Sequence, residues 1–588
     1  MTGPRARPGP ARAASLVGLL AGFVSVVDLV RLLRWPLLSD PDPSWAAARL
    51  VLALAVAAAG ATAGAAAGGG FLLLARSRVG RAGPSPLPVS RAALAAMAIA
   101  AVTAGAALRL LAVGRVPVSY LEDEVNLVGP ALELSGTWGD FRDAIRPFPY
   151  GVPDPHEMIG VLYLRLLRSS LTVFGTTPFG LRFPSAAGGC LSLVTGTLLA
   201  RALLPAGGGT LTAIVLSGLR WHVILSLWGW HSILLAPLCD IATLLLLSAS
   251  RRGSAARAGL AGLVLGIGAH LYLASWIAAC ALTAFALLSP SDGTRQGLPP
   301  RAARGAAFVA GFLLAAAPLF LFAEGRATPY FGRASRHSVF AEMRYANSGM
   351  PLFAAAADAI VAPLGLPEPE GRHDLTDRSR LGVVVSLAFA LGLVGALVRP
   401  RLEASSLLLC HAFAAFAAAV AGGQAGLPNG FRFGYLTTVT ALAASAGSLT
   451  LASLVPGSWR PAWLVAGALA AASLIGARDA ILVWPERQAT FDSFHGEDTV
   501  LGASASRWGS YGEVSVEHGL GRNDLAIETV SRFRLDGSRE PGPVPRRTRR
   551  FRIVHPGSQA SPEERLVERV RDPWGREWAV VLGRAERS

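Results

Sequence analysis

The sequence predicts a mainly α-helical, polytopic membrane protein with a small α+β domain at its C-terminal side. Hydrophobic residues make up 52% of the 588 residues and charged residues only 16%, whereas about a quarter of the residues in soluble proteins are charged. The apolar residues come in blocks of about 20, long enough for a helix to cross a bilayer. Beyond residue 484 these blocks give way to charged and alternating sequence.

The apolar blocks distinguish membrane helices from the alternative, a large soluble helical repeat protein. Such a protein would need helices with one polar face. The stretch "LVLALAVAAAGATAGAAAGGGFLLLA" (50–75) has no polar face. The basic start "MTGPRARPGPARAA" resembles a signal peptide, but no clear A-x-A cleavage site follows. We therefore expect the first apolar block to be a retained span.

Read in order, the apolar blocks predict about 13 membrane-spanning helices. The expected ranges are 13–33, 45–75, 92–113, 184–204, 210–228, 231–249, 258–271, 274–288, 305–323, 381–398, 403–421, 435–454 and 461–484.

Arginine sets the expected orientation, because basic residues gather in cytoplasmic loops. The chain has no lysine, and its arginines recur in alternate short loops, at 76–91, 250–257, 295–304 and 399–401. These loops and the N-terminus are therefore expected in the cytoplasm. The loop 114–183 and residues 485–588 then lie outside it. The arginine-only, Ala/Gly-rich composition is typical of a high-GC bacterium, so we expect a multi-pass protein of the cytoplasmic (inner) membrane.

Charge and cysteine content exclude other classes of protein. The net charge of +16 follows from membrane topology, and no nucleic-acid-binding motif accompanies it. Cys190, Cys239, Cys280 and Cys410 each lie within an apolar block without metal-site spacing. They are expected to be buried thiols and not disulfides or zinc ligands.

The chain divides by composition into two expected domains, a membrane domain at 1–484 and an extracytoplasmic domain at 485–588. In the second, "EVSVEH" and "REWAVVLG" alternate as strands do. The stretch "SPEERLVERV" has the pattern of a capped short helix.

The acidic stretch "LEDE" (121–124) lies shortly after the 92–113 block, beyond "GRVPVSY" (114–120). A carboxylate in hydrocarbon costs roughly several kcal/mol, so Asp123 is expected at the membrane surface or in a water-filled cavity. A solvated loop acid is the alternative interpretation. The same loop continues through "DPHE" (154–157) to an amphipathic helix with Arg165 and Arg168, which can lie flat on a membrane. Together these features favour a loop that covers a site at the membrane surface.

Several stretches, taken in order, resemble the GT-C superfamily of polyprenyl-phosphate-sugar-dependent glycosyltransferases, in particular the protein mannosyltransferase and aminoarabinose transferase branch (family 39-like). The resemblance spans about residues 92–500. It is carried by "DE" (123–124), "DPHE" (154–157), "FGTTPFGLRFPSA" (174–186), "RWHVILSLWGWHSILLAPL" (220–238), "GLVLGIGAHLYLASW" (262–276) and "LPNGFRFGYL" (427–436).

The resemblance implies that Asp123 is the catalytic residue. A carboxylate can remove the proton of an acceptor hydroxyl as that hydroxyl attacks the anomeric carbon of a sugar. Glu124 would position the acceptor or Asp123. The implied partners are a polyprenyl-phosphate-linked sugar, membrane lipid, and an acceptor hydroxyl on a protein, lipid or glycan.

The remaining candidate site residues form three groups. Arginine suits a donor phosphate because its charged guanidinium binds in a bidentate manner. The candidates are Arg432, Arg182, Arg333 and Arg336. The candidates for lining the acceptor site are His156, Glu157, His231 and Tyr272. The sequence indicates no definite cofactor. A divalent cation is the one candidate, with Asp123, Asp154, His156 and Glu157 as its candidate ligands.

Two alternatives stay open. A transporter or flippase would show internal repeats or charged residues within its spans, whereas the polar residues of this sequence gather in the outer loops. A non-catalytic GT-C-like protein of envelope assembly is the other alternative. It is favoured by the absence of arginines that the family often has near Leu227 and Trp276.

Overall fold

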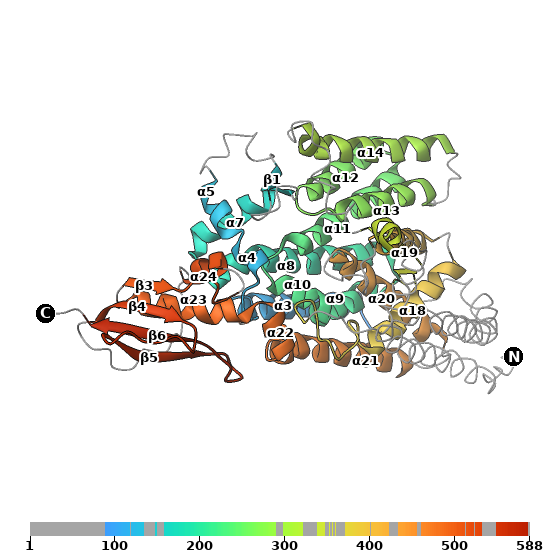
Figure 1. Cartoon of the computed structure of the whole chain (residues 1–588). Coiled ribbons are helices and arrows are strands. Elements are labelled where there is room, and N and C mark those ends of the chain that lie inside the picture. Colours follow the sequence, from blue (N-terminus) through green and yellow to red (C-terminus); the bar gives the residue numbers. More distant parts are fainter. Residues whose placement is uncertain are drawn as a thin grey trace, which may run out of the picture.

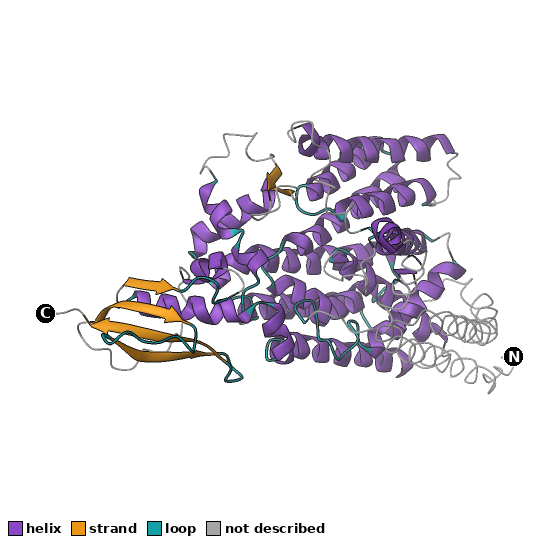
Figure 2. Cartoon of the chain, in the orientation of Figure 1, coloured by secondary structure: helices purple, strands orange, loops and turns teal. Residues whose placement is uncertain are grey.

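The helical bundle forms the body of the protein, and a small sheet projects from one end (Figures 1 and 2). The computed structural model describes residues 89–117, 119–134, 147–149, 158–289, 298–321, 338–346, 352, 355–356, 359, 371–399, 402–422, 433–454, 460–511, 513–521, 524–531 and 548–585. The two predicted spans at 13–33 and 45–75 lie outside these residues.

The bundle consists of apolar helices of different lengths. Six described helices are long and apolar enough to cross a membrane, and the bent pair α9–α10 is a seventh candidate. The helices of the bundle are α3 (Arg91–Ala112), α8 (Pro178–Leu203), α9 (Gly208–Gly218), α10 (Arg220–Leu227), η1 (His231–Leu234), α11 (Leu235–Arg252), α12 (Ala255–Ala269), α13 (Ser275–Leu288), α14 (Leu298–Leu321), α18 (Val383–Val398), α19 (Glu403–Ala421), α20 (Leu436–Leu454), α21 (Arg460–Arg478) and the π-helix η3 (Asp479–Val483).

Each predicted span from 92 to 484 coincides with helix in the structure. The predicted division near residue 272 is confirmed, because α12 and α13 are separate helices. One span differs from its prediction. The range 210–228 is not a single helix but the pair α9–α10, bent by 55°.

Side-chain hydrogen bonds define the first residues of α3 and α8, the helices that precede and follow the acidic loop. The Ser90 side chain caps α3 by accepting a hydrogen bond from Ala93 N. Thr177 caps α8 in the same way through Gly180 N at 3.0 Å, with Pro178 at the first helical position. Both caps satisfy amides that a helix start leaves without a partner.

The acidic loop folds against the bundle as short helices. These elements are α4 (Glu122–Val125), α5 (Val128–Glu133), β1 (Pro147–Pro149), β2 (Met158–Gly160) and α7 (Val161–Phe174). The predicted amphipathic helix is α7. It buries Leu164 and Leu167, and its exposed Arg168 donates to Leu132 O at 2.8 Å. Arg165, by contrast, is buried, so the two arginines do not share one solvated face.

The C-terminal segment, residues 485–588, contains α22 (Gln488–Ser493), α23 (Gly496–Gly509), α24 (Asp524–Ser531) and a four-stranded sheet. The strands are β3 (Glu513–Val516), β4 (Thr548–Val554), β5 (Glu564–Arg571) and β6 (Glu577–Ala585), in the order β3-β4-β6-β5. Strands β3 and β4 are parallel, and the other pairs are antiparallel. α23 packs on the sheet through Trp508, whose ring centroid lies 4.8 Å from that of Phe551.

Two predictions for this segment are confirmed and one is wrong. "EVSVEH" contains β3, and "REWAVVLG" contains most of β6. The stretch "SPEERLVERV", predicted as a helix, is instead largely β5. It pairs with β6 through Leu566 opposite Leu582 and Val570 opposite Ala579. Cross-strand pairing of these apolar side chains outweighs the local capping pattern.

Contacts place the acidic loop and the C-terminal segment at the same end of the bundle. Tyr120 N donates to Thr499 Oγ1 at 2.9 Å. At the other end, Arg251 of α11 bonds Glu403 of α19 at 2.7 Å, and Arg304 of α14 bonds Ser250 Oγ at 3.0 Å. We call these the loop end and the opposite end. Which of them faces the cytoplasm stays a prediction.

Candidate functional site

A fully buried ion pair lies at the centre of the loop end. Glu124 of α4 and Arg182 of α8 both have side chains with 0% exposure. Arg182 Nε donates to Glu124 Oε2 at 2.8 Å, and Nη2 donates to Oε1 at 3.2 Å. This bidentate geometry fixes both the position and the rotation of the carboxylate.

Arg182 also binds the chain just before α4. Its Nη1 donates to Pro117 O at 2.6 Å, and its Nη2 donates to Ser119 O at 2.7 Å. The guanidinium lies over the ring of Tyr120, 4.8 Å from the centroid. Burial raises the pKa of the Tyr120 phenol to about 12, and the nearby arginine only partly offsets this. Arg182 thus holds the whole turn from Pro117 to Glu124.

A glycine backbone gives Glu124 its third donor. Gly229 N donates to Glu124 Oε2 at 3.1 Å. A Cβ at this glycine would lie 2.8 Å from Glu124 Oε2 and 3.4 Å from Arg182 Cγ. Only glycine allows the backbone to approach the carboxylate this closely.

The predicted catalytic residue, Asp123, precedes Glu124 in α4. Its side chain lies outside the described part of the chain. Since α4 is a single short turn, the buried contacts of Glu124 also fix the backbone position of Asp123. Sequence reasoning gave Glu124 a positioning role without naming a partner, and the structure supplies Arg182 as that partner.

Two further predicted residues gather beside Gly229. His231 is 2% exposed and packs between aromatic rings. Its centroid lies 4.4 Å from Trp230, 5.2 Å from Tyr163 and 5.2 Å from Tyr272. His231 Nδ1 has no hydrogen-bond partner among the described residues. The structure therefore brings Glu124, Arg182, His231 and Tyr272 to the same end of the bundle.

The remaining candidates cannot be placed. Arg432, Arg333, Arg336, Asp154, His156 and Glu157 lie outside the described residues. Within the described part, no group of three or more His, Cys, Asp or Glu side chains could hold a metal ion. The divalent cation and its ligands stay a prediction.

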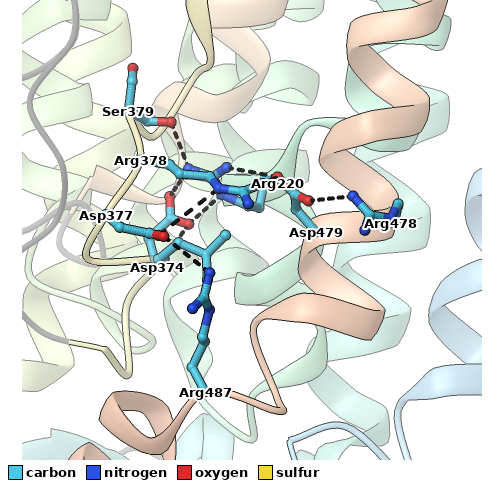
Figure 3. A network of polar contacts seen from close by, with 9 residues as sticks. Arg220, Asp374, Asp377, Arg378, Ser379, Arg478, Asp479 and Arg487 are labelled. Atoms are coloured by element: carbon cyan, nitrogen blue, oxygen red, sulfur yellow. Dashed lines mark hydrogen bonds and ion pairs between the residues drawn. The ribbon is translucent and has the colours of Figure 1, made fainter.

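A second network of charges at the loop end, with Arg220, Asp374 and Asp479 buried at its centre, was not predicted from sequence (Figure 3). Arg220, at the start of α10, binds both carboxylate oxygens of Asp374, and its Nη1 lies 3.5 Å from Asp479 Oδ2. Arg378 Nη1 donates to the same Asp479 oxygen at 2.7 Å. The network ties residues 374–379 to α10 and η3. The dense charges of "HDLTDRSR" (373–380) are the sequence signal that could have indicated it.

Polar residues also lie inside the spans, contrary to the expectation that they gather only in outer loops. Asp240 of α11 is 2% exposed and accepts from Thr195 Oγ1 at 2.8 Å and Thr438 Oγ1 at 3.3 Å. Arg109 of α3 and His222 of α10 are fully buried and hydrogen-bonded to each other. Hydrogen bonds from neighbouring helices make such groups tolerable in a membrane.

These features define a polytopic helical membrane protein with a buried, arginine-fixed acidic turn at one end. No family model and no curated protein sequence matches the chain.

Solved structures of two kinds of protein resemble it. One is the oligosaccharyltransferase of Archaeoglobus fulgidus with a tethered acceptor peptide, at 14% identity and a TM-score of 0.44, covering 74% of this chain. This chain matches 63% of that protein, under two thirds of its length. The other is ArnT of Cupriavidus metallidurans bound to undecaprenyl phosphate, at 13% identity and a TM-score of 0.47, covering 82% of this chain and 97% of ArnT. Both similarities are distant, so function is argued from the chain's own residues.

Proposed function

We propose that this chain is an integral-membrane glycosyltransferase that moves a sugar from a polyprenyl phosphate to an acceptor hydroxyl, with Asp123 as general base. The observation that carries the proposal is the buried Glu124–Arg182 pair, because it fixes the turn that bears Asp123. Burying a pair of charges costs free energy, because both charges lose their hydration. A turn that carries a catalytic group needs such a fixed geometry, because that group must be held close to the reacting atoms. The motifs that resemble GT-C enzymes support the same assignment.

The reaction is a single displacement. The acceptor oxygen attacks the anomeric carbon while its proton passes to the Asp123 carboxylate. The bond between the anomeric carbon and the phosphate oxygen breaks, and its electron pair leaves with the polyprenyl phosphate. One displacement of this kind inverts the anomeric centre.

Within this proposal Arg182 is a positioning residue and not a ligand of the donor phosphate. Its Nε, Nη1 and Nη2 each donate to Glu124 or to a carbonyl of residues 117–119. The donor phosphate is assigned to the other predicted arginines, Arg432, Arg333 and Arg336. The ring cluster around His231 is assigned to the acceptor side.

The test is a transfer assay with radiolabelled polyprenyl-phosphate sugars and membranes that contain the protein. Asp123→Asn should reduce transfer by about 10²–10⁴-fold, the usual contribution of a positioned base, with the protein still present in the membrane. Glu122→Gln, which removes the neighbouring carboxylate, is the matched control and should transfer at nearly the wild-type rate.

Two outcomes would contradict the proposal at different points. Transfer by Asp123→Asn at the wild-type rate would exclude Asp123 as the base. Absence of transfer by the wild-type protein, across donors of several sugars, would favour the non-catalytic or transport alternatives.

A further inference from the structure

The helix pair α9–α10 contains a break within the bundle. The two helices are joined at Leu219 and bent by 55°. A break in a membrane helix frees backbone carbonyls that no water can satisfy, so protein donors must bind them. Here the last turn of α9 presents the carbonyls of Leu216 and Ser217.

Arg109 of α3 supplies those donors. Its Nη2 donates to Leu216 O at 3.0 Å, and its Nη1 donates to Ser217 O at 3.1 Å and to Gly105 O at 2.7 Å. A Cβ at Gly105 would lie 2.7 Å from Ser217 Oγ. The glycine therefore allows α3 and α9 to approach closely enough for the guanidinium to reach the break.

The same guanidinium also contacts both turns of α10. Arg109 Nη2 lies 2.6 Å from His222 Nδ1, and Arg109 Nε donates to Ser226 Oγ at 3.2 Å. A guanidinium has only donors, so His222 Nδ1 is the acceptor. The proton of the neutral ring is then on Nε2, which donates to Ser192 Oγ of α8.

The far end of α10 meets the proposed active loop. Two residues after Leu227, Gly229 N donates to Glu124 Oε2 at 3.1 Å. An eight-residue helix is about 12 Å long, so a change in its direction at the break moves Gly229 relative to Glu124. At the start of the helix, Arg220 is bound separately to Asp374 and Asp479.

We propose that Arg109 and His222 are positioning residues, which set the direction of α10 and thereby hold Gly229 N–H against Glu124. The effect on catalysis rests on the proposed function, since it acts through Glu124 on the turn that carries Asp123. Arg109 has no ion-pair partner among the described residues, so its contacts serve the break and His222.

The kinetic test compares two buried arginines. Arg109→Lys keeps the charge, but a lysine cannot bond several carbonyls at once as the guanidinium does. We expect kcat to fall about 10²-fold, because a misplacement of about 1 Å in an active site can cause a loss of this size. KM should be nearly unchanged. Arg304→Lys is the matched control. Arg304 is also buried and bonds Ala286 O and Ser250 Oγ, but at the opposite end. Its substitution should leave kcat per folded molecule unchanged.

Two variants of His222 distinguish a positioning role from a simple folding defect. His222→Gln can still accept from Arg109 and donate to Ser192, so it should retain most of kcat. His222→Phe can do neither and should behave like Arg109→Lys. Equal kcat for His222→Gln and His222→Phe would overturn the proposal.

Amide hydrogen exchange tests the structural step without any activity. Exchange across residues 228–231 should be at least several-fold faster in Arg109→Lys than in the wild type, and unchanged in Arg304→Lys. Unchanged exchange in Arg109→Lys overturns the inference. Faster exchange in a protein that transfers no sugar supports the positioning role while rejecting the glycosyltransferase assignment.

Discussion

Two arginine–glutamate pairs, one at each end of the helical bundle, differ in their exposure to solvent. At the loop end, Arg182 and Glu124 form a pair in which both side chains are 0% exposed. At the opposite end, Arg251 and Glu403 form a pair at 2.7 Å in which the arginine side chain is 39% exposed. The pairs have similar distances but very different solvent access.

This difference shows where the fold depends on charge. A buried ion loses its hydration, so each partner needs the other to offset that cost. An exposed ion keeps its hydration, and its partner adds little. The Arg182–Glu124 pair is therefore expected to be sensitive to single substitutions and the Arg251–Glu403 pair tolerant of them.

Arg182→Met should give the largest effect on stability. It leaves the Glu124 carboxylate buried without its cation, which typically costs about 3–5 kcal/mol. Thermal unfolding in detergent would measure the loss. The double variant Arg182→Met with Glu124→Leu removes both charges and should recover much of it. A double variant as unstable as the single one would mean that packing, not charge, holds this site.

Thr499→Val should give an intermediate effect, because it removes a hydroxyl acceptor and keeps the side-chain shape. Tyr120 N–H would lose its partner, and a buried amide without one costs about 1–3 kcal/mol. Limited proteolysis of the C-terminal segment, together with thermal unfolding, would detect the loosening. Thr172→Val is the control, since the exposed Thr172 hydroxyl bonds only its own helix at Arg168 O. Equal effects of the two substitutions would argue against a specific contact.

Arg251→Ala should give the smallest effect, less than about 1 kcal/mol. Any loss should shrink as salt is added, because the pair is partly exposed. The same unfolding measurement at low and high ionic strength provides the check. A loss as large as that of Arg182→Met would remove the distinction between the two pairs.

The sequence predicted the bundle well because membrane helices are a local property. A run of about twenty apolar residues indicates a membrane-spanning helix, whichever other helices pack against it. The bend between Gly218 and Arg220 was missed, and an isolated glycine in a helical pattern is only a weak signal of a break. The strand β5 was missed because its alternating apolar pairs form only when β6 lies beside it.

The site was only partly predictable for the same reason. The acidic turn stands out in sequence as a charge cluster after a span. Its partner Arg182 lies 58 residues away, and nothing local distinguishes an arginine that binds a carboxylate from one that binds a phosphate. Arg109 and His222 lie within apolar stretches, and their contact joins residues 113 positions apart.

The hydrogen bond between Tyr120 and Thr499 has a consequence for how the protein is made. The two residues are 379 positions apart. At a synthesis rate of about 5–20 residues per second, the ribosome needs on the order of 20–80 s to reach the second after the first. Throughout that interval the acidic turn exists without its C-terminal partner, and the Tyr120 amide lacks the Thr499 hydroxyl as its acceptor. The loop end therefore reaches its final form only late in translation, when α23 docks onto a turn synthesised long before it.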